Sequence, residues 1–150
     1  MALDDDVRRL ARIPLLAELE LEALRLIAFS AEARILRSGD VVFRTGDAAD
    51  AGYFVMTGSI ALATGDGGAA QVAGPDALIG ELALIASSRR PVTATAREPT
   101  TVLKISRALF HRVLTEFPAS AARMRDLLAK RLATFVGELQ RTRGFSVEAS

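Results

Sequence analysis

Cysteine is absent from this chain of 150 residues, and histidine occurs once, as His111. Without cysteine there is no disulfide framework, no thiolate metal site and no cysteine nucleophile. One histidine cannot build a multi-histidine metal cluster. The sequence also lacks a marked serine–histidine–acid arrangement and a nucleotide-triphosphate loop. We therefore expect a protein that is not an enzyme, with no catalytic residues, no metal and no cofactor.

An excess of charge of either sign is missing too, because 19 basic and 18 acidic residues leave a net charge of +1. Such a balance gives no overall electrostatic footprint for nucleic acid, so we expect no direct nucleic-acid binding. No run of about 18 or more apolar residues appears, and we expect no membrane span. The chain begins with MALDDD, acidic where a signal peptide would be basic, which predicts a cytoplasmic protein.

Half of the residues are hydrophobic, and a chain of 150 residues can enclose one adequate core. We therefore expect a single domain over residues 1–150. Apolar residues recur at helical spacing over 5–29, and Pro14 divides them into two short helices, which we place within 1–30. From 31 to 105, short stretches rich in β-formers alternate with glycine-containing turns, which is typical of an antiparallel barrel or jelly roll.

The last third of the sequence has a helical pattern. Ser106 is the expected N-cap of a helix that Pro118 ends or bends. Apolar residues from Met124 to Leu139 then recur at intervals of three and four, which predicts one wide stripe on a long helix. We expect C-terminal helices over 106–143 and a frayed tail over 144–150. The predicted fold class is mainly β with flanking α: an antiparallel β jelly-roll barrel with N-terminal helices, one short inner helix and two C-terminal helices.

The stretch from Leu78 to Ala96 carries the clearest chemical pattern. Gly80 and Glu81 precede a short apolar run, and Arg90 follows nine positions after Glu81. Backbone N–H groups at the start of a helix attract anions, and an arginine adds a fork of charged donors. A carboxylate beside them can accept hydrogen bonds from hydroxyls. Together these groups suit a small ligand that carries one phosphate and one sugar hydroxyl.

Together with three other stretches, this segment resembles the cyclic nucleotide-binding domain, which occurs in catabolite-activator-type regulators, protein kinase regulatory subunits and cyclic-nucleotide-gated channels. The resemblance extends from about Val7 to Arg143. The matching stretches are LARIPL at 10–15 (the family's opening helix and turn), RSGDVVFRTGD at 37–47 (its first barrel hairpin), GYFVMTGSI at 52–60 (its next strand, tight turn and strand) and GELALIASSRR at 80–90 (its phosphate-binding cassette). The short helix after Gly80 would then be the phosphate-binding helix.

The resemblance implies a role for each residue at the start and end of the cassette. Glu81 would accept a hydrogen bond from the ribose 2′-hydroxyl, and Arg90 would pair with the cyclic phosphate. Gly80 would let the backbone approach the ligand closely, and the backbone N–H groups of Leu82 and Ala83 would bind phosphate oxygens. Glu81 and Arg90 would dominate affinity and orientation, because a hydrogen bond to a charged group contributes about 1.5–3 kcal/mol.

Further residues are candidates for ligand contacts by the same resemblance. Val92 and Thr93 fall on the strand that lines the base and phosphate side, and Arg89 is either an accessory phosphate contact or a solvent-exposed side chain. Arg131 and Phe135, on the last helix, are candidates for a lid that stacks on the base. Plain packing against the barrel or a partner helix is the alternative for these two residues.

Pro91 departs from the family pattern. It stands where the family commonly has a small residue whose backbone N–H faces the phosphate, and proline has no N–H. In some members a threonine at this position favours guanine. Because proline supplies no hydroxyl, the sequence favours cAMP over cGMP as the ligand.

We therefore expect a regulatory sensor that binds a cyclic nucleotide and moves its C-terminal helices in response. The expected partners are the nucleotide, a second copy of the chain paired through the last helix, and a regulated effector domain or protein. Two alternatives stay open. One is an interaction or assembly module of this fold that does not bind nucleotide, which Pro91 motivates. The other is the sensor part of a larger transcription regulator, channel, transporter or enzyme.

Overall fold

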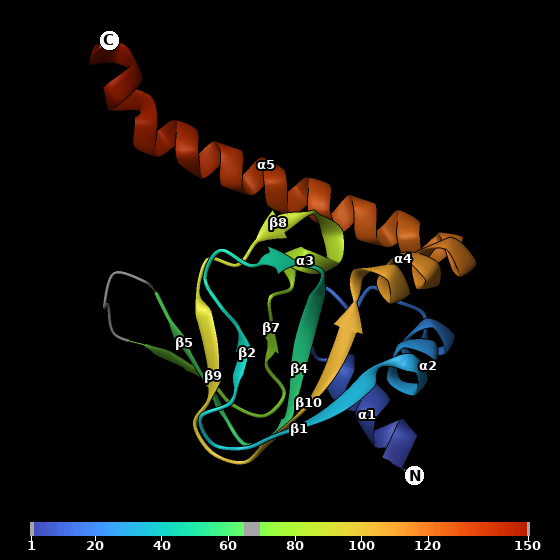
Figure 1. Ribbon diagram of the computed structural model, residues 1–150. Helices are drawn as coiled ribbons and strands as arrows, with labels where there is room; N and C mark the ends of the chain where they lie inside the picture. Colours follow the sequence, from blue (N-terminus) through green and yellow to red (C-terminus); the bar gives the residue numbers. More distant parts are fainter. Residues whose placement is uncertain (1, 65–69, 150) are drawn as a thin grey trace.

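The computed structural model describes the backbone of residues 2–64 and 70–149, and within these ranges the side chains from residue 3 to residue 134. Short strands occupy the middle of the chain and longer helices lie at both ends (Figure 1). The helices are α1 (Ala2–Leu10), α2 (Leu21–Ser30), α3 (Leu82–Ile85), α4 (Arg107–Glu116) and α5 (Pro118–Ala149). The strands are β1 (Glu32–Leu36), β2 (Val41–Phe43), β3 (Ala48–Ala49), β4 (Ala51–Thr57), β5 (Ile60–Ala63), β6 (Gln71–Ala73), β7 (Leu78–Ile79), β8 (Ser88–Arg89), β9 (Thr93–Ala96) and β10 (Thr100–Ser106).

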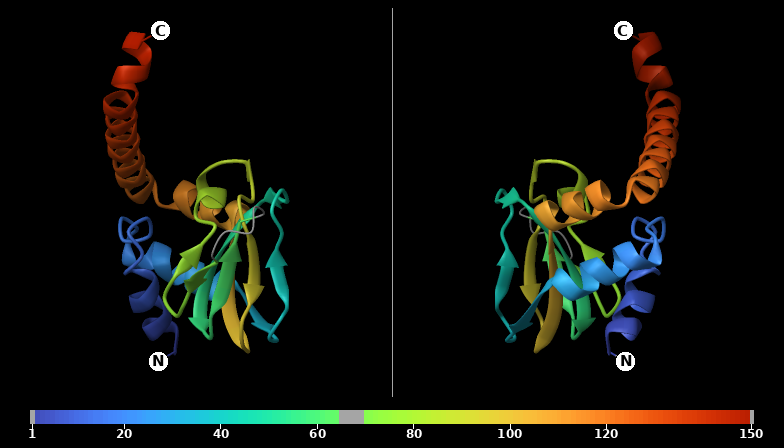
Figure 2. Two further views of the ribbon diagram at one scale, coloured as in Figure 1. Left: turned by 90° about the vertical axis from the view of Figure 1, so that its left-hand side faces the viewer. Right: turned by 90° about the vertical axis from the view of Figure 1, so that its right-hand side faces the viewer.

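The strands form two four-stranded sheets and one short two-stranded sheet, and all their pairings are antiparallel. The strand order is β1-β10-β4-β7 in the first sheet and β2-β9-β5-β6 in the second, while β3 pairs with β8. The two larger sheets face each other (Figures 1 and 2). The predicted fold, mainly β with flanking helices in a jelly-roll arrangement, is therefore confirmed, with two facing sheets in place of one closed barrel.

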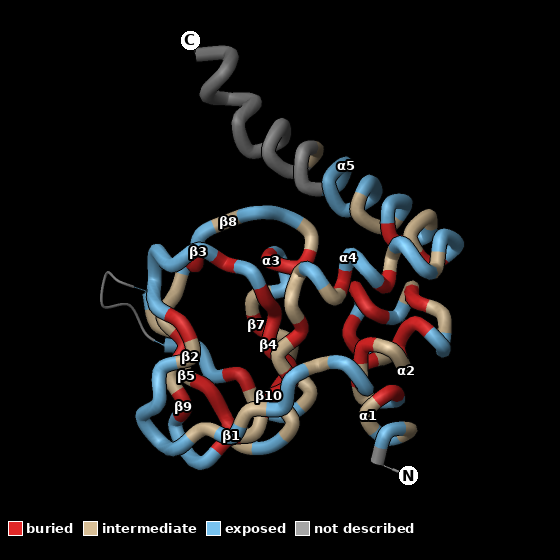
Figure 3. The backbone as a smooth tube through the Cα atoms, turned by 45° about the vertical axis from the view of Figure 1, so that its right-hand side comes forward, coloured by how far each residue is buried: buried red, intermediate tan, exposed pale blue. Residues whose placement is uncertain are grey.

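The apolar core has two layers, and successive side chains of β4 point alternately into one layer and the other. Tyr53 and Val55 lie in the layer between the sheets together with Ile60, and Phe54 lies in the layer between the first sheet and the helices. Successive residues of a strand point to opposite faces, so one strand can serve both layers. Figure 3 shows the buried residues in red along β4 and where the helices meet the first sheet.

The helical layer brings the N-terminal helices against the C-terminal helices. Leu10 of α1, Ile27 of α2, Phe110 of α4 and Met124 of α5 are all buried in the same cluster as Phe54. Figure 2 shows α1 and α2 beside the sheets and α4 and α5 across one end of them. The first two helices are separated by turns around Pro14, as the sequence predicts.

Two of the helix boundaries predicted for residues 106–150 agree with the structure, and one differs. Ser106 caps α4, because its Oγ accepts a hydrogen bond from the Leu109 N–H at 3.0 Å. Pro118 separates α4 from α5 and is the first residue of α5, a position where the missing N–H costs little. We expected a tail from Gly144, but α5 continues to Ala149, since no proline follows Pro118 to interrupt its hydrogen bonds.

Candidate functional site

A pocket of about 320 Å³ opens beside α3. Residues 80–83 line one part of it and residues 88–92 another, and Phe43 and Leu62 contribute from the second sheet. Folding thus brings both ends of the predicted cassette around one cavity. The predicted ligand residues that line the pocket are Gly80, Glu81, Leu82, Ala83, Arg89, Arg90 and Val92, whereas Thr93 does not line it.

Arg90 is a buried arginine that uses only part of its hydrogen-bonding capacity within the described part of the chain. The residue is 4% exposed, and its Cζ lies 4.1 Å from the ring centroid of Phe43. Nη2 donates to the carbonyl oxygen of Ala51 at 2.7 Å. Nε and Nη1 are buried and have no hydrogen-bond partner among the described residues. Leaving such donors unpaired in the interior is costly, so the arrangement indicates a site for an anion that would complete the set.

The charge of Arg90 is held in place by its surroundings. Burial lowers the pKa of its guanidinium below the usual range, and Tyr53, Asp50 and Asp47 act in the opposite direction. An arginine nevertheless stays protonated at neutral pH. The ring of Phe43 adds a favourable cation–π interaction with the guanidinium. The pocket therefore contains a fixed positive charge.

Gly80 provides the space that Arg90 occupies. Its φ is +72°, in the left-handed region that favours glycine. A Cβ atom added at this position would lie 2.5 Å from Arg90 Nη1, closer than two such atoms can approach. We predicted that this glycine lets a ligand approach the backbone, and the structure adds that the arginine also needs the missing side chain.

The backbone of Arg90 is fixed by the turn that follows β2. The Arg90 N–H donates to the Asp47 carbonyl at 2.8 Å, and the Arg90 carbonyl accepts from the Gly46 N–H at 2.8 Å. The Oγ1 of Thr93 accepts a hydrogen bond from the Thr45 N–H at 3.0 Å. The hydroxyl of Thr93 therefore stabilises this turn, and Thr93 itself does not line the pocket.

Glu81 and Arg131 connect the pocket to α5. Arg131 Nη1 lies 3.9 Å from Glu81 Oε1, and both side chains are about half exposed. Glu81 stands at the N-cap of α3, but its carboxylate accepts no capping hydrogen bond there. Its oxygens are therefore available to a hydroxyl group. Phe135, the other candidate for a lid, lies outside the residues whose side chains the structure describes.

The remaining predicted contacts are partly engaged within the protein. The Ala83 N–H donates to the Gly80 carbonyl at 3.1 Å, so a phosphate oxygen would have to share or displace this bond. Leu82 begins α3 and its side chain is exposed. Arg89 is exposed and donates from Nη1 to the Gly46 carbonyl at 3.0 Å. Within the described part of the chain, no group of three or more histidine, aspartate or glutamate residues is arranged to hold a metal ion.

A second arginine supports the pocket, and no motif in the sequence pointed to it. Arg107 is the first residue of α4, and its Nη1 donates to the carbonyl oxygens of Ala49 at 2.9 Å, Ala83 at 3.2 Å and Ala86 at 3.2 Å. Its backbone N–H donates to the Asp50 carbonyl at 2.8 Å. Because Ala49 and Ala83 line the pocket, Arg107 fixes two parts of the pocket wall relative to α4.

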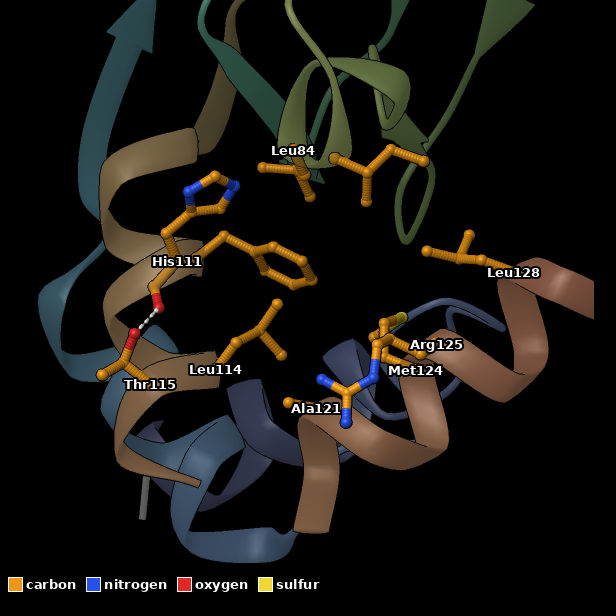
Figure 4. Close-up of a pocket in the computed structure, with 10 residues that line it drawn as sticks. Leu84, His111, Leu114, Thr115, Ala121, Met124, Arg125 and Leu128 are labelled. Atoms are coloured by element: carbon orange, nitrogen blue, oxygen red, sulfur yellow. Dashed lines mark hydrogen bonds between the residues drawn. The ribbon is translucent and has the colours of Figure 1, made fainter. Parts of the chain in front are cut away.

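A separate hollow of about 400 Å³ lies between α3, α4 and α5 (Figure 4). Leu84 of α3, Leu114 of α4 and Leu128 of α5 border it from three directions, and His111 and Arg125 are the basic residues in its wall. The wall is otherwise largely apolar. The short helix beside the pocket packs on the C-terminal helices through the buried Leu84, and the hollow lies next to this contact.

The fold and the site define a β jelly roll with a small pocket suited to an anion. A family model described as "Cyclic nucleotide-binding domain" matches residues 33–117. This span contains nearly all the strands, α3 and α4, and every residue of the pocket described above. The chain belongs to the cyclic nucleotide-binding domain family.

Solved structures extend the similarity to the flanking helices. A cyclic nucleotide-binding-like protein from Brucella abortus is 42% identical with a TM-score of 0.69, and the match covers 75% of this chain and 99% of that one. The N-terminal domain of a transcriptional regulator from Streptomyces coelicolor is 30% identical with a TM-score of 0.79, covering 87% of this chain and 94% of that one. The similarity thus includes most of the domain and not the sheets alone.

The curated relatives are much longer proteins. Lysophospholipase nte1 from Neurospora crassa is 33% identical over 130 residues, which is 84% of this chain but 9% of that protein. A domain of this family is a regulatory fold and not itself a catalytic one. Among the helices of residues 2–64 and 70–149, none has the length and apolar character needed to cross a membrane.

Proposed function

We propose that this domain binds a cyclic nucleotide in the pocket beside Arg90 and acts as a regulatory sensor, with cAMP preferred over cGMP. The observation that carries the proposal is the pair of buried guanidinium nitrogens, Nε and Nη1, that have no partner among the described residues. A cyclic phosphate supplies one negative charge and oxygen acceptors, which are what these donors lack. Membership of the family supports the same class of ligand.

Other groups of the pocket suit the rest of such a ligand. Under this proposal the carboxylate of Glu81, which caps no N–H of α3, accepts the hydrogen bond of the ribose 2′-hydroxyl. The backbone at Gly80, Leu82 and Ala83 approaches the phosphate. Leu62 and Val92 are apolar residues of the same wall, and they offer a surface for the purine ring.

The preference for adenine follows from the residues after Arg90. Pro91 and Val92 line the pocket and carry no hydroxyl. The hydroxyl of Thr93 is already bonded to the Thr45 N–H. The amino group of a guanine would find no hydroxyl partner in residues 91–93, and an unpaired polar group lowers affinity. Adenine places no such demand on this segment.

The proposed output is a movement of the C-terminal helices. Arg131 lies 3.9 Å from Glu81 in the structure, so a ribose hydroxyl on Glu81 would compete with it. Arg131 and Phe135 would then be free to stack on the base as a lid. A ligand can shift helix positions only if its affinity differs between the two arrangements. The lid contacts would supply that difference.

The movement of α5 would be transmitted to a partner of this domain. A second copy paired through α5 and an effector domain are the two candidates, and in both the domain acts in the cytoplasm. Matched proteins from Streptomyces coelicolor and Neurospora crassa carry the similar domain within larger chains. This supports a role as the sensor part of a larger regulator, channel, transporter or enzyme.

Calorimetric titration with cAMP and with cGMP tests the proposal on the wild type, on Arg90→Ala and on Arg112→Ala as a control. Arg112 is an exposed arginine of α4 that pairs with Glu116 at 3.2 Å, so its removal changes the net charge equally without touching the pocket. Tighter binding of cAMP by the wild type and the control, with loss of binding in Arg90→Ala, is the expected result.

The absence of nucleotide binding would contradict the proposal. If the wild type binds neither nucleotide at millimolar concentration, the proposal that the domain is a nucleotide sensor is overturned. That result would favour an interaction or assembly module of this fold, for which the missing N–H of Pro91 is the motivating feature. Binding of cGMP as tight as that of cAMP would overturn only the preference for adenine.

A further inference from the structure

We propose that Arg107 is a positioning residue that transmits occupancy of the pocket to α4, an inference that rests on the function proposed above. Its Nη1 donates to three carbonyl oxygens, those of Ala49 at 2.9 Å, Ala83 at 3.2 Å and Ala86 at 3.2 Å. Ala49 lies in β3, while Ala83 and Ala86 lie in α3 and at its C-cap. A single side chain at the start of α4 therefore holds two elements that form the pocket.

Three consecutive carbonyl groups connect Arg107 to Arg90. The Ala49 carbonyl accepts from Arg107 Nη1, the Asp50 carbonyl accepts from the Arg107 N–H at 2.8 Å, and the Ala51 carbonyl accepts from Arg90 Nη2 at 2.7 Å. An anion that engages Arg90 therefore acts on the segment that Arg107 holds. Because hydrogen bonds weaken steeply with distance and angle, a shift of this segment or of α3 is passed to the first turn of α4.

The remaining contacts between α3 and α4 are apolar. Leu84 is buried in the same cluster as Phe110 of α4, and a hollow of about 400 Å³, bordered by Leu84, Leu114 and Leu128, lies beside this contact (Figure 4). Apolar contacts are not directional, whereas hydrogen bonds depend steeply on distance and angle. In the part of the chain that the structure describes, the hydrogen bonds between α4 and α3 come from Arg107 alone.

The position of Arg107 on its helix supports a specific role. A cation in the first turn of a helix is disfavoured by the helix dipole, and the first turn of α4 contains no acidic residue to offset it. The carbonyl oxygens from β3 and α3 provide the compensation. Arg107 is thus stabilised by the elements that it connects to α4 and not by its own helix.

Hydrogen exchange with and without saturating cAMP tests the inference in the wild type, Arg107→Lys, Arg107→Met and the control Arg112→Ala, with affinities measured by calorimetry. In the wild type and the control, we expect cAMP to change exchange both at 80–90 and at 107–116. In Arg107→Met, which keeps the chain length but no donor, affinity should stay within about tenfold, and the response at 107–116 should be lost. Arg107→Lys keeps three donors on one nitrogen and should respond weakly.

The outcomes separate this inference from the proposed function. Failure of the wild type to bind either cAMP or cGMP overturns both. Binding with a response confined to 80–90 in the wild type, or a full response at 107–116 in Arg107→Met, overturns this inference and leaves the proposed function intact. If Arg107→Met does not fold, Arg107→Lys decides, because a response weaker than that of the wild type supports the inference and an undiminished one overturns it.

Discussion

Two arginines contact the segment Ala49–Ala51, and they differ in how completely their donors are engaged. Arg107 donates from Nη1 to three carbonyl groups. Arg90 donates to one, and two of its buried nitrogens have no partner among the described residues. Hydrogen bonds that form without ligand stabilise the fold, whereas buried donors left without a partner favour the binding of a ligand. Substitution of the two residues should therefore separate binding from stability.

The largest expected effect is the loss of nucleotide affinity in Arg90→Ala. Two hydrogen bonds to a charged group contribute about 3 kcal/mol or more, so the affinity for cAMP should fall about 100-fold or more in calorimetry. Stability without ligand should change by less than about 1 kcal/mol, because the loss of one hydrogen bond and of the cation–π contact with Phe43 is offset by the removal of two buried donors that have no partner among the described residues. A large loss of stability in the absence of ligand would contradict this distinction.

Arg107→Ala should show the reverse pattern. Three carbonyl groups lose a charged donor, and the free energy of unfolding without ligand should fall by about 2 kcal/mol. Urea denaturation measures this loss. The exposed pair of Arg112 and Glu116 provides the control, since Arg112→Ala should cost no more than about 0.5 kcal/mol. Equal costs for the two substitutions would show that the three contacts of Arg107 add nothing beyond a surface ion pair.

Gly80→Ala sharpens the comparison by displacing Arg90 without removing it. The added Cβ would meet Nη1 at 2.5 Å and would require a left-handed φ, so we expect about a tenfold loss of cAMP affinity and about 1 kcal/mol of stability. Gly74→Ala is the matched control, because a Cβ there meets no atom within 4 Å. Unchanged affinity in Gly80→Ala would mean that the guanidinium position matters little.

The smallest expected effect concerns alkaline stability. Burial raises the pKa of Tyr53 above its usual value of 10.0, with the charge of Arg34 and then Arg90 opposing the shift. The unfolded chain then loses this proton first, so the stabilising contribution is complete below the unfolded pKa and is lost as pH rises through the folded one. Tyr53→Phe should make the free energy of unfolding fall less steeply above about pH 10. Identical slopes in the two proteins would contradict this.

Local patterns in the sequence predicted most of the fold. Short stretches rich in β-formers and glycine turns identified the longer strands, while Ser106 and Pro118 identified the start of α4 and its separation from α5. The strands β3, β6, β7 and β8 were not predicted, because each has only two or three residues and so shows little or no alternation. They form because folding brings their partners alongside.

The site was predictable where its chemistry belongs to one short segment. The spacing from Gly80 to Arg90 correctly indicated that these residues meet, and their predicted ligand roles stay predictions. Arg107 could not be predicted, because its partners are backbone carbonyls 58, 24 and 21 residues away that carry no distinctive side chain. The stacking of Arg90 on Phe43 likewise depends on how β2, which contains Phe43, packs near the connection between β8 and β9, which contains Arg90.

Ligand binding at Arg90 would also affect how long the protein persists in a cell. Under the proposed function, the empty domain is the less stable form, and a ligand at 100 times its dissociation constant adds about 2.7 kcal/mol to the free energy of unfolding. Proteases act on the unfolded fraction, so a change of this size can alter abundance several-fold. The nucleotide would then control how much of the protein is present as well as its conformation.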